Sequence, residues 1–468
     1  MAHGLKTIAD PTCHDDVDTL DQRALQEQGL ACVRTGDYPR ALHYAQALTR
    51  RFPSGADNWK LLGVAQQKLN QLHEGLASLK QALALAPGNT NALCLYADGL
   101  LLLNRHDEAF HHYKQVLQLA PGHVGASRQA ATLLALSHRL QDAWAVLQGA
   151  MSLSPQVADL RVDAVGVALR MGALTEARLN ASEALVLAPD QASVQHAVGQ
   201  VQMRAGDLPA AIYSLREELR LLPSPVRAAV SASPTPFDQQ ANEALMWATL
   251  AQLEQAGVHA FPAAGTLLGL VREGHLLPFD KDLDLGLPFD EMDTACQCLL
   301  AGGWVEHEQS AGLLNPRAFR HQASGLMLDL CGYRIEADTG IPLGGFWMHG
   351  VPDAWNRVMA FPQLSLRRVL RPEGRVWALA EPEAWLEALY GDWRTPDPYF
   401  DTVIAARNQR GFALLTQCYA LLRLADQLRD GKLRKAQATT RIWLRHFPGD
   451  TQIQKIDAAL SAALPGTA

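Results

Sequence analysis

Three aspartates at alternate positions, Asp280, Asp282 and Asp284, are the residues whose types and spacing most directly suggest chemistry. An extended chain places all three on one face of the segment PFDKDLDLGL, while Leu283 and Leu285 lie on the other face. Carboxylates crowded onto one face repel one another, and their pKa values rise unless cations neutralise them. Hard divalent cations take oxygen ligands, and magnesium is usually paired with a substrate phosphate. The spacing therefore predicts a site for Mg²⁺ or Mn²⁺ beside a bound phosphate.

Two other interpretations of these aspartates are open. Together with Glu291 they fall at positions 1, 3, 5 and 12 of an EF-hand loop. However, Leu285 stands at the sixth position, where that loop needs a glycine for its sharp turn, and no helix leads directly into the loop. The second interpretation is an exposed acidic edge strand without a catalytic role.

A glycine-threonine turn upstream supplies a place for the phosphate. Gly265 and Thr266 end the short apolar segment VHAFPAAG and precede a helical stretch over residues 267–273. Glycine lets the backbone approach a ligand, and the free amides and dipole of the following helix favour anionic oxygens. Arg272, further along that helix, either reaches the phosphate or pairs with a nearby acidic residue. Lys281 lies on the strand face opposite the aspartates and is a further candidate phosphate contact.

An isolated carboxylate in a second apolar segment, GLMLDLCGY at residues 325–333, is the remaining candidate. The alternation of leucines in this segment predicts a strand. A charge in a buried strand is costly unless it has a partner, so Asp329 needs one there. A metal ion shared with the first cluster would be that partner. A surface-facing position at the end of the strand would remove the need, and both interpretations stay open.

The first half of the chain repeats every 34 residues. Prolines recur at that interval, at Pro53, Pro87, Pro121, Pro155, Pro189 and Pro223. Alanine or glycine recurs in a second phase, at Ala41, Gly75, Ala109, Ala143, Ala177 and Ala211. Small residues let two helices approach closely, and proline stops the second helix at each boundary. Period, phase and residue types together resemble the tetratricopeptide repeat, a helix-turn-helix unit that we predict six times over residues 22–223.

Stacked repeats of this kind form a superhelix, whose concave face is expected to bind an extended peptide or a partner protein. The other interpretation is that the array only supports the neighbouring domain. From Cys418 to Pro448 the pattern occurs once more, because Ala436 and Pro448 stand in the alanine and proline phases. This predicts one degenerate repeat or helical hairpin near the C-terminus.

Composition narrows the class of protein. The chain has 468 residues, 48% hydrophobic and 19% charged, as expected of a globular protein with several domains. The formal net charge is −7, whereas proteins that bind nucleic acid are usually basic, and this argues against nucleic acid as a partner. No window of about 18 apolar residues appears and the N-terminus lacks a secretory pattern, so we expect a cytoplasmic protein without a transmembrane anchor. Seven scattered cysteines fit a reduced compartment, and Cys296 and Cys298 are expected to pack rather than to bind zinc.

The segment GTLLGLVREGHLLPFDKDLDLGL resembles the signature of the LicD/fukutin-related transferases, which have the nucleotidyltransferase fold. A second block, VWALAEPEAWLEALYGDWRTPDPYFD at residues 376–401, is similar to the C-terminal block of that family. The resemblance covers about residues 240–401. It implies an α/β domain with a small mixed sheet, which binds a divalent metal through an Asp-x-Asp pair and a third acidic residue on a neighbouring strand.

Carried over residue by residue, the resemblance makes Asp282 and Asp284 the pair, Asp280 the preceding carboxylate and Asp329 the best candidate for the third acid. The glycine-threonine turn would bind phosphate. Members of the family move a phospho-substituent, such as phosphocholine or phosphoribitol, from a CDP-linked donor to a glycan hydroxyl. The resemblance implies that carboxylate-held metal neutralises the diphosphate, and that one carboxylate, Asp329 for example, takes the proton of the acceptor.

The leading hypothesis is thus a metal-dependent transferase of a phospho-substituent, whose repeats recruit the acceptor or a partner protein. One alternative is a nucleotidyltransferase that moves the nucleotide itself and uses the same carboxylates. The half of the donor that reaches the acceptor separates these two reactions. Another alternative is a repeat scaffold with an inactive transferase-like domain, for which loss of the carboxylates would be the sign, yet all are present.

The predicted fold class is an α+β multidomain chain, in which an all-α solenoid precedes an α/β domain. The expected parts are an N-terminal tail (residues 1–21), six tetratricopeptide repeats (22–223), a Ser-, Pro- and Ala-rich linker (224–240), a nucleotidyltransferase-fold domain (241–403) and a C-terminal helical hairpin (404–464).

Overall fold

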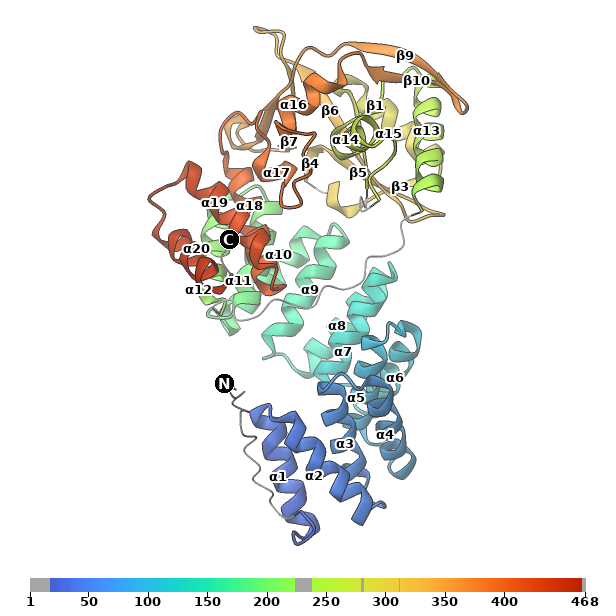
Figure 1. Ribbon diagram of the computed structural model, residues 1–468, viewed down its shortest axis with the longest axis vertical. Coiled ribbons are helices and arrows are strands. Elements are labelled where there is room, and N and C mark those ends of the chain that lie inside the picture. The colour runs from blue at the N-terminus through green and yellow to red at the C-terminus, as the bar shows by residue number, and fades with distance from the viewer. Residues whose placement is uncertain (1–16, 224–237, 279–281, 311, 465–468) are drawn as a thin grey trace, which may run out of the picture. The chain divides into compact units, whose positions relative to one another are not determined.

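The computed structural model describes residues 17–223, 238–278, 282–310 and 312–464 (Figure 1). Most of the predicted linker therefore lies outside the described residues, as do Asp280 and Lys281. The chain divides into two compact units, one ending at Asp163 and the other beginning at Ala164.

The first unit consists of paired antiparallel helices. They are α1 (Gln22–Thr35), α2 (Tyr38–Arg51), α3 (Ala56–Lys68), α4 (Leu72–Leu85), α5 (Thr90–Leu102), α6 (His106–Leu119), α7 (Val124–Leu136) and α8 (Leu140–Leu153). Ala41 and Ala109 are completely buried. At Gly63, a Cβ atom would lie 2.6 Å from Cγ of Leu79 on the paired helix, which is too close for a side chain. The small residues of the repeat are therefore explained by the close approach of the two helices in each pair.

The second unit contains two groups of repeat helices that are far apart in sequence. After α9 (Ala158–Arg170), which crosses the division, come α10 (Leu174–Leu187), α11 (Ala192–Arg204) and α12 (Leu208–Leu221). The later group is α18 (Leu414–Arg429), α19 (Leu433–His446) and α20 (Thr451–Ala463). Leu215 of α12 and Leu421 of α18 are both fully buried in one apolar cluster. The C-terminal helices therefore stack on the sixth helix pair.

A recurring hydrogen bond shows that α18 and α19 are a seventh repeat in register with the others. A hydroxyl on the second helix of a pair donates to a glutamine Oε1 on the first helix, 12 residues earlier. The bonds are Ser78 to Gln66 (2.7 Å), Ser214 to Gln202 (2.8 Å) and Thr439 to Gln427 (2.8 Å). The sequence from α13 to α17, called here the sheet domain, is therefore inserted between the sixth and seventh repeats.

Ion pairs also join the sixth and seventh repeats. The guanidinium of Arg216 on α12 contacts both carboxylate oxygens of Asp450, at 2.6 and 3.0 Å. Arg429 on α18 lies 2.6 Å from Glu218 of α12, whose side chain is fully buried. A buried carboxylate left without a cation is strongly destabilising, so these pairs hold α18 and the start of α20 to α12 in one arrangement.

The sheet domain is built around an eight-stranded mixed sheet. Its strands are β1 (Phe261–Pro262), β2 (Asp282–Pro288), β3 (Trp304–Glu306), β4 (Leu313–Asn315), β5 (Arg317–His321), β6 (Met327–Ile335), β7 (Pro342–Met348) and β8 (Arg357–Ala360). The order is β1-β2-β6-β5-β3, with β7 pairing β4, β6 and β8. Among the described strands of this sheet, β2 and β6 are parallel to each other and the other pairings are antiparallel. A separate hairpin is formed by β9 (Leu366–Arg371) and β10 (Gly374–Leu379).

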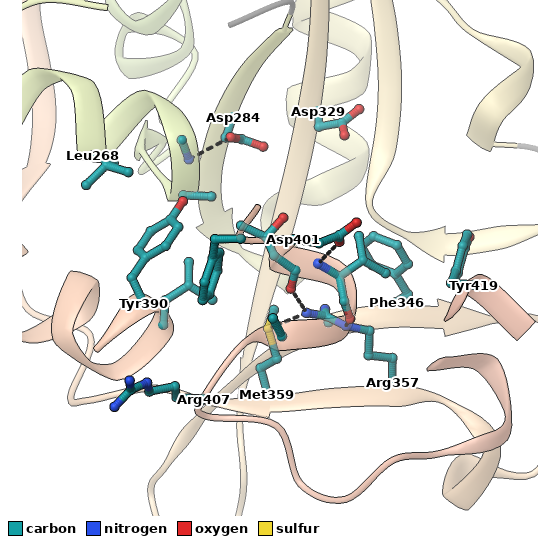
Figure 2. Close-up of a pocket in the computed structure, with 18 of the residues that line it drawn as sticks. Leu268, Asp284, Asp329, Phe346, Arg357, Met359, Tyr390, Asp401, Arg407 and Tyr419 are labelled. Carbon is teal, nitrogen blue, oxygen red and sulfur yellow. Dashed lines mark hydrogen bonds between the residues drawn. The ribbon is translucent and has the colours of Figure 1, made fainter. Parts of the chain in front are cut away.

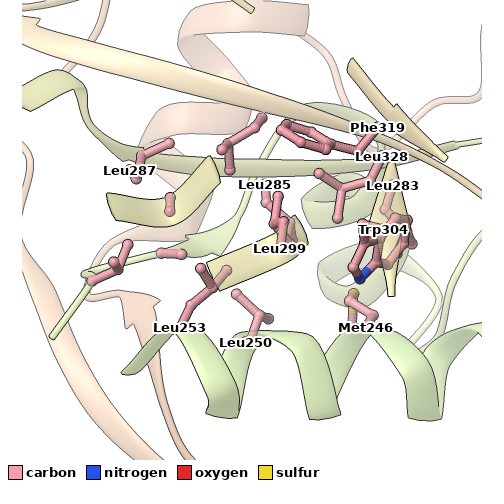
Figure 3. Packing of buried hydrophobic residues seen from close by; sticks show 14 of the residues in the cluster. Met246, Leu250, Leu253, Leu283, Leu285, Leu287, Leu299, Trp304, Phe319 and Leu328 are labelled. Carbon is pink, nitrogen blue, oxygen red and sulfur yellow. The ribbon is translucent and has the colours of Figure 1, made fainter. Parts of the chain in front are cut away.

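Helices pack against the sheet and close its core. They are α13 (Gln239–Gln255), α14 (Ala264–Arg272), α15 (Met292–Ala301) and α16 (Pro382–Tyr390), while α17 (Thr402–Ala405) lies against α18 and α19. Figure 3 shows Met246 and Leu250 of α13 directed toward the leucines of β2, with Trp304 of β3 beside them. Leu283, a member of the predicted apolar strand face, is completely buried there. The core therefore anchors the strand that carries the aspartates.

Three elements near the site were predicted from sequence and are present with shifted bounds. The helical stretch expected over 267–273 is α14, which begins three residues earlier at Ala264. The aspartate strand is β2, and the segment at 325–333 is β6. The earlier start of α14 places the glycine-threonine turn inside its first turn.

Candidate active site

The parallel pairing of β2 with β6 brings the predicted carboxylates together. Asp284 is the register partner of Asp329, and Asp282 is the partner of Met327. The leucines of β2 are buried, whereas Asp282 and Asp284 are half-buried and line a cavity together with Asp329. Figure 2 shows Asp284 and Asp329 on neighbouring strands at one side of this cavity. The alternating pattern thus follows strand geometry, because the leucine face of β2 is buried in the core and the aspartate face lines the cavity.

The start of α14 orients Asp284. The N–H of Gly265 donates to Oδ2 of Asp284 at 2.8 Å, and the N–H of Asp284 donates to Oγ1 of Thr266 at 2.8 Å. Ala264 has φ +37°, a left-handed conformation that is strained for a residue with a side chain. This strained residue stands directly before the amide that holds the carboxylate.

The glycine-threonine turn was predicted to bind phosphate, and the structure gives its two residues different surroundings. Gly265 lines the cavity. Thr266 is completely buried, its hydroxyl accepts from the backbone of Asp284, and it is not among the residues that line the cavity. The role of Thr266 in the structure is to attach α14 to β2, and phosphate binding by Gly265 remains a prediction.

Asp329 carries a carboxyl group whose pKa is perturbed. Burial, together with the nearby charge of Asp282, raises its pKa to about 7. An acid with a pKa in this range is suited to accept a proton near neutral pH. The electrostatic environment also favours any cation that would lie between the two carboxylates. The interpretation of Asp329 as a surface-facing residue at a strand end is wrong, because the side chain lines the cavity beside the other aspartates.

The packing of two aromatic rings explains why a glycine, Gly286, follows the Asp-x-Asp pair. A Cβ at this position would lie 2.7 Å from the ring of Phe261 and 2.8 Å from the ring of Tyr333. These two rings stack with centroids 5.8 Å apart and cover the strand at this point. Only glycine lets them pack directly against β2, which supports the strand next to its carboxylates.

Arg272 lines the cavity and has partners on two sides. Its Nε donates to Glu273 at 2.8 Å, so the pairing with a nearby acid that the sequence left open is present. Its Nη1 donates to the backbone oxygen of Trp393 at 3.2 Å. This second bond joins α14 to the segment after α16, and contact with a phosphate stays a prediction.

The cavity, of about 1550 Å³, includes residues to which the sequence assigned no role. Tyr390, Trp393 and Asp401 come from the block that resembles the family's C-terminal segment, and all three line the cavity. Figure 2 shows Tyr390 and Asp401 below the aspartates. Another wall comes from α19, which belongs to the seventh repeat. The sequence signal for the first group was the block itself. For α19 no local signal existed, because its place depends on how the repeats stack.

Arg357 is a fully buried cation at the base of this region. It is 2% exposed, and burial lowers its pKa to about 10. Its guanidinium donates to the backbone oxygens of Val403 and Thr402, at 2.6 and 2.5 Å, and lies over the ring of Phe346. These bonds position the segment that begins at Asp401, whose carboxylate pairs with Arg423 of α18. The site is thus joined to the seventh repeat through partly buried polar contacts.

The donor set at the carboxylate edge fits a hard divalent cation. Within the described ranges no three His, Cys, Asp or Glu side chains are grouped closely enough to hold a metal by themselves. Magnesium, however, is commonly held by one or two carboxylates together with substrate phosphates, and Asp282 and Asp284 supply such a pair. Asp280, the remaining predicted ligand, lies outside the described residues.

A mixed sheet with adjacent strands that carry an Asp-x-Asp pair and a third aspartate is the arrangement expected of a nucleotidyltransferase-type domain. Residues 257–324 match the family described as LicD/FKTN/FKRP, nucleotidyltransferase domain. Residues 27–90 and 60–124 match the tetratricopeptide repeat. The chain therefore carries a LicD-type domain of a transferase family together with tetratricopeptide repeats, as the sequence predicted.

Solved structures similar to this chain are repeat proteins. A thermophilic tetratricopeptide repeat protein, TTC0263 from Thermus thermophilus, is 20% identical, covering 39% of this chain and 100% of its own, with a TM-score of 0.34. The pilF protein of Pseudomonas aeruginosa is 17% identical over 45% of this chain and 93% of its own, with a TM-score of 0.39. No curated protein sequence matches the chain. Across the described part of the chain, no helix is both long and apolar enough to cross a membrane.

Proposed function

We propose that the chain is a metal-dependent transferase that moves a phospho-substituent, of the phosphocholine or phospho-alditol type, from a CDP-linked donor to a hydroxyl of a glycan or related acceptor. The observation that carries this proposal is the register of Asp284 with Asp329 beside Asp282, at one side of a cavity lined in addition by seven arginines. Oxygen ligands for a cation and guanidinium groups for phosphate oxygens then occur in one place.

Asp282 and Asp284 would hold Mg²⁺ or Mn²⁺, which supplies charge neutralisation for the diphosphate of the donor. The chain contributes the orientation, because the Gly265 amide holds Asp284 by a 2.8 Å bond. Arg272 lines the same cavity as the pair and is the proposed contact for the remaining phosphate oxygens, because the single N–H of Gly265 already donates to Asp284. Its guanidinium is in place before the substrate binds, which favours electrostatic stabilisation of the leaving group.

The group transfer then balances as a displacement at phosphorus. The acceptor oxygen forms a bond to the phosphorus that bears the substituent, and the bond from that phosphorus to the bridging oxygen breaks. CMP leaves with the electron pair, and the proton of the acceptor hydroxyl passes to Asp329. A pKa of about 7 makes Asp329 able to take this proton near neutral pH and to release it afterwards.

Calorimetric titration tests the donor site. The wild type is titrated with CDP-choline and with CDP-ribitol in the presence of Mg²⁺ or Mn²⁺, and again in the presence of a chelator. The double variant Asp282→Asn with Asp284→Asn is titrated alongside Asp290→Asn, a control at an exposed aspartate just beyond β2. We expect cation-dependent binding that the double variant loses and the control retains. Binding of neither donor by the folded wild type would contradict the proposal and favour another nucleotide or an inactive domain.

We further propose that the repeat array recruits the acceptor or a partner protein. The support is the match of residues 27–124 to the tetratricopeptide repeat. Stacked repeats usually offer an extended concave surface of this kind for binding.

A further inference from the structure

The wall of the cavity that α19 forms is basic and belongs to the seventh repeat. Four residues of this helix line the cavity, and they fall at helical spacing on one face: Ala438, Arg441, Ile442 and Arg445. Ala438 and Ile442 are half-buried, whereas both arginines are exposed. The helix therefore presents two guanidinium groups, four residues apart, above a small apolar surface.

Neither arginine has a partner among the described residues. Two other cavity arginines are engaged, since Arg423 pairs with Asp401 and Arg357 donates to backbone oxygens. No hydrogen bond or ion pair joins the side chain of Arg441 or Arg445 to any part of the chain that the structure describes. Like charges four residues apart on a helix destabilise it slightly, so a bound anion would relieve an existing repulsion.

The composition of α19 supports the same conclusion. Its sequence, LRKAQATTRIWLRH, contains three arginines and one lysine and no acidic residue, in a chain whose net charge is −7. The cations that line the described part of the cavity are all arginines, without a lysine. Arginine presents a planar fork that binds phosphate or carboxylate through two parallel hydrogen bonds, which suits recognition of an oxyanion.

The volume of the cavity leaves room for a second ligand beside the donor. Pockets for one small molecule are typically about 300–1,000 Å³. The cavity here measures about 1550 Å³ and extends from the aspartates of β2 to α19. A group transfer needs two substrates. If the donor diphosphate occupies the carboxylate side, the α19 wall is available to the acceptor.

We infer that Arg441 and Arg445 form a subsite for an oxyanion carried by the acceptor, so that the acceptor is a phosphorylated or carboxylated sugar or alditol rather than a neutral one. The assignment to the acceptor rests on the proposed transferase function, whereas the anion subsite itself does not. In this arrangement the seventh repeat contributes part of the substrate site of the inserted domain.

Ligand-observed NMR of the full chain in a chelator tests the subsite. The probes are glucose 1-phosphate, glucuronate and neutral glucose. The double variant Arg441→Gln with Arg445→Gln is compared with Arg434→Gln with Lys435→Gln, which removes the same charge from exposed positions of α19 that do not line the cavity. We expect one or both anionic probes to bind the wild type and the control, with at least about tenfold weaker binding to the first variant. Neutral glucose should not bind.

The preferred probe identifies the anion, because glucose 1-phosphate stands for a phosphorylated acceptor and glucuronate for a carboxylated one. Equal binding to both double variants, or no binding of either anion to the wild type, would overturn the inference. The double variant Asp282→Asn with Asp284→Asn keeps this result apart from the donor proposal. It should retain the probes even though it loses the donor, and loss of the probes would place the anion at the carboxylates instead.

Discussion

The two walls of the cavity differ in how they are made. At the carboxylate edge, Asp282, Asp284 and the oriented amide of Gly265 come from one stretch of sequence, and only Asp329 joins from a neighbouring strand. On the other wall, α19 is positioned by packing and ion pairs between the sixth and seventh repeats, on either side of the inserted domain. The contrast teaches that reactive groups can be arranged by local strand and turn geometry, whereas the surroundings of a substrate depend on contacts between distant parts of the chain.

The largest expected effect is at the carboxylate edge. Asp284→Asn removes a charge that would hold the divalent cation, while the new amide oxygen is still able to accept from Gly265. We expect release of CMP from the donor to slow roughly 100- to 1,000-fold, with an unchanged unfolding midpoint. Asp290→Asn should retain the wild-type rate. A rate for Asp284→Asn within a few-fold of wild type would remove this residue from the site.

The next largest effect is expected where the seventh repeat stacks on the sixth. Leu421 is completely buried between α18 and α12, so Leu421→Ala should lower the free energy of unfolding by about 2–5 kcal/mol, as cavity-forming substitutions do. Leu300→Ala, at a leucine that is 53% exposed, is the matched control and should change it by less than about 0.5 kcal/mol. Urea unfolding followed by circular dichroism measures both. A similar small change in the two variants would mean that the C-terminal helices do not stack stably on α12.

At the carboxylate edge, unlike at the α19 wall, a buried carboxyl group should make the stability of the protein depend on pH. Without metal, burial raises the pKa of Asp329 from 3.8 to about 7, so the folded protein keeps a proton that the unfolded chain has lost. Stability should therefore fall, by roughly 2–4 kcal/mol, as the pH rises from about 4 to about 7, and then level off. Urea unfolding in a chelator at several pH values measures this fall, which Asp329→Asn should abolish. An identical pH profile in the variant would contradict the assignment.

A smaller effect distinguishes the two roles considered for Thr266, which are phosphate binding and attachment of α14 to β2. In Thr266→Val the N–H of Asp284 loses its acceptor inside the protein, which should cost about 1–3 kcal/mol of stability. Thr266→Ser keeps the oxygen and should recover most of it. Thermal and urea unfolding distinguish these variants. If Thr266→Val were as stable as the wild type while donor affinity fell, the threonine would be a phosphate contact rather than a support for β2.

Much of the fold and of the carboxylate edge follows from the sequence because the determinants are local. The 34-residue spacing of Pro53 and its equivalents indicated the repeats, and strand alternation separated Leu283 from Asp282 and Asp284. The proximity of Asp329 to Asp284 could be predicted because both residues lie in short apolar strands. In each of these cases a few neighbouring residues carry the information.

Other features depended on tertiary contacts that no local pattern encodes. Thr266 had the type and place of a phosphate ligand, but the close packing of α14 on β2 buries its hydroxyl against the Asp284 backbone. The C-terminal hairpin was predicted, yet its stacking on α12 rests on Arg216 and Asp450, which are far apart in sequence. The arginines of α19 gave no signal, because a basic helix face is ordinary until its surroundings are known.

The central claim is that the substituent-bearing phosphorus is the one attacked, and isotope labelling tests it without knowledge of the acceptor. The protein is incubated with CDP-choline or CDP-ribitol and the divalent cation in ¹⁸O-labelled water, which replaces the acceptor, and the products are analysed by mass spectrometry. The account predicts that ¹⁸O appears in phosphocholine or ribitol phosphate and not in CMP. Incorporation of ¹⁸O into CMP would show attack at the nucleotide phosphorus, which would contradict the account and identify a nucleotidyltransferase.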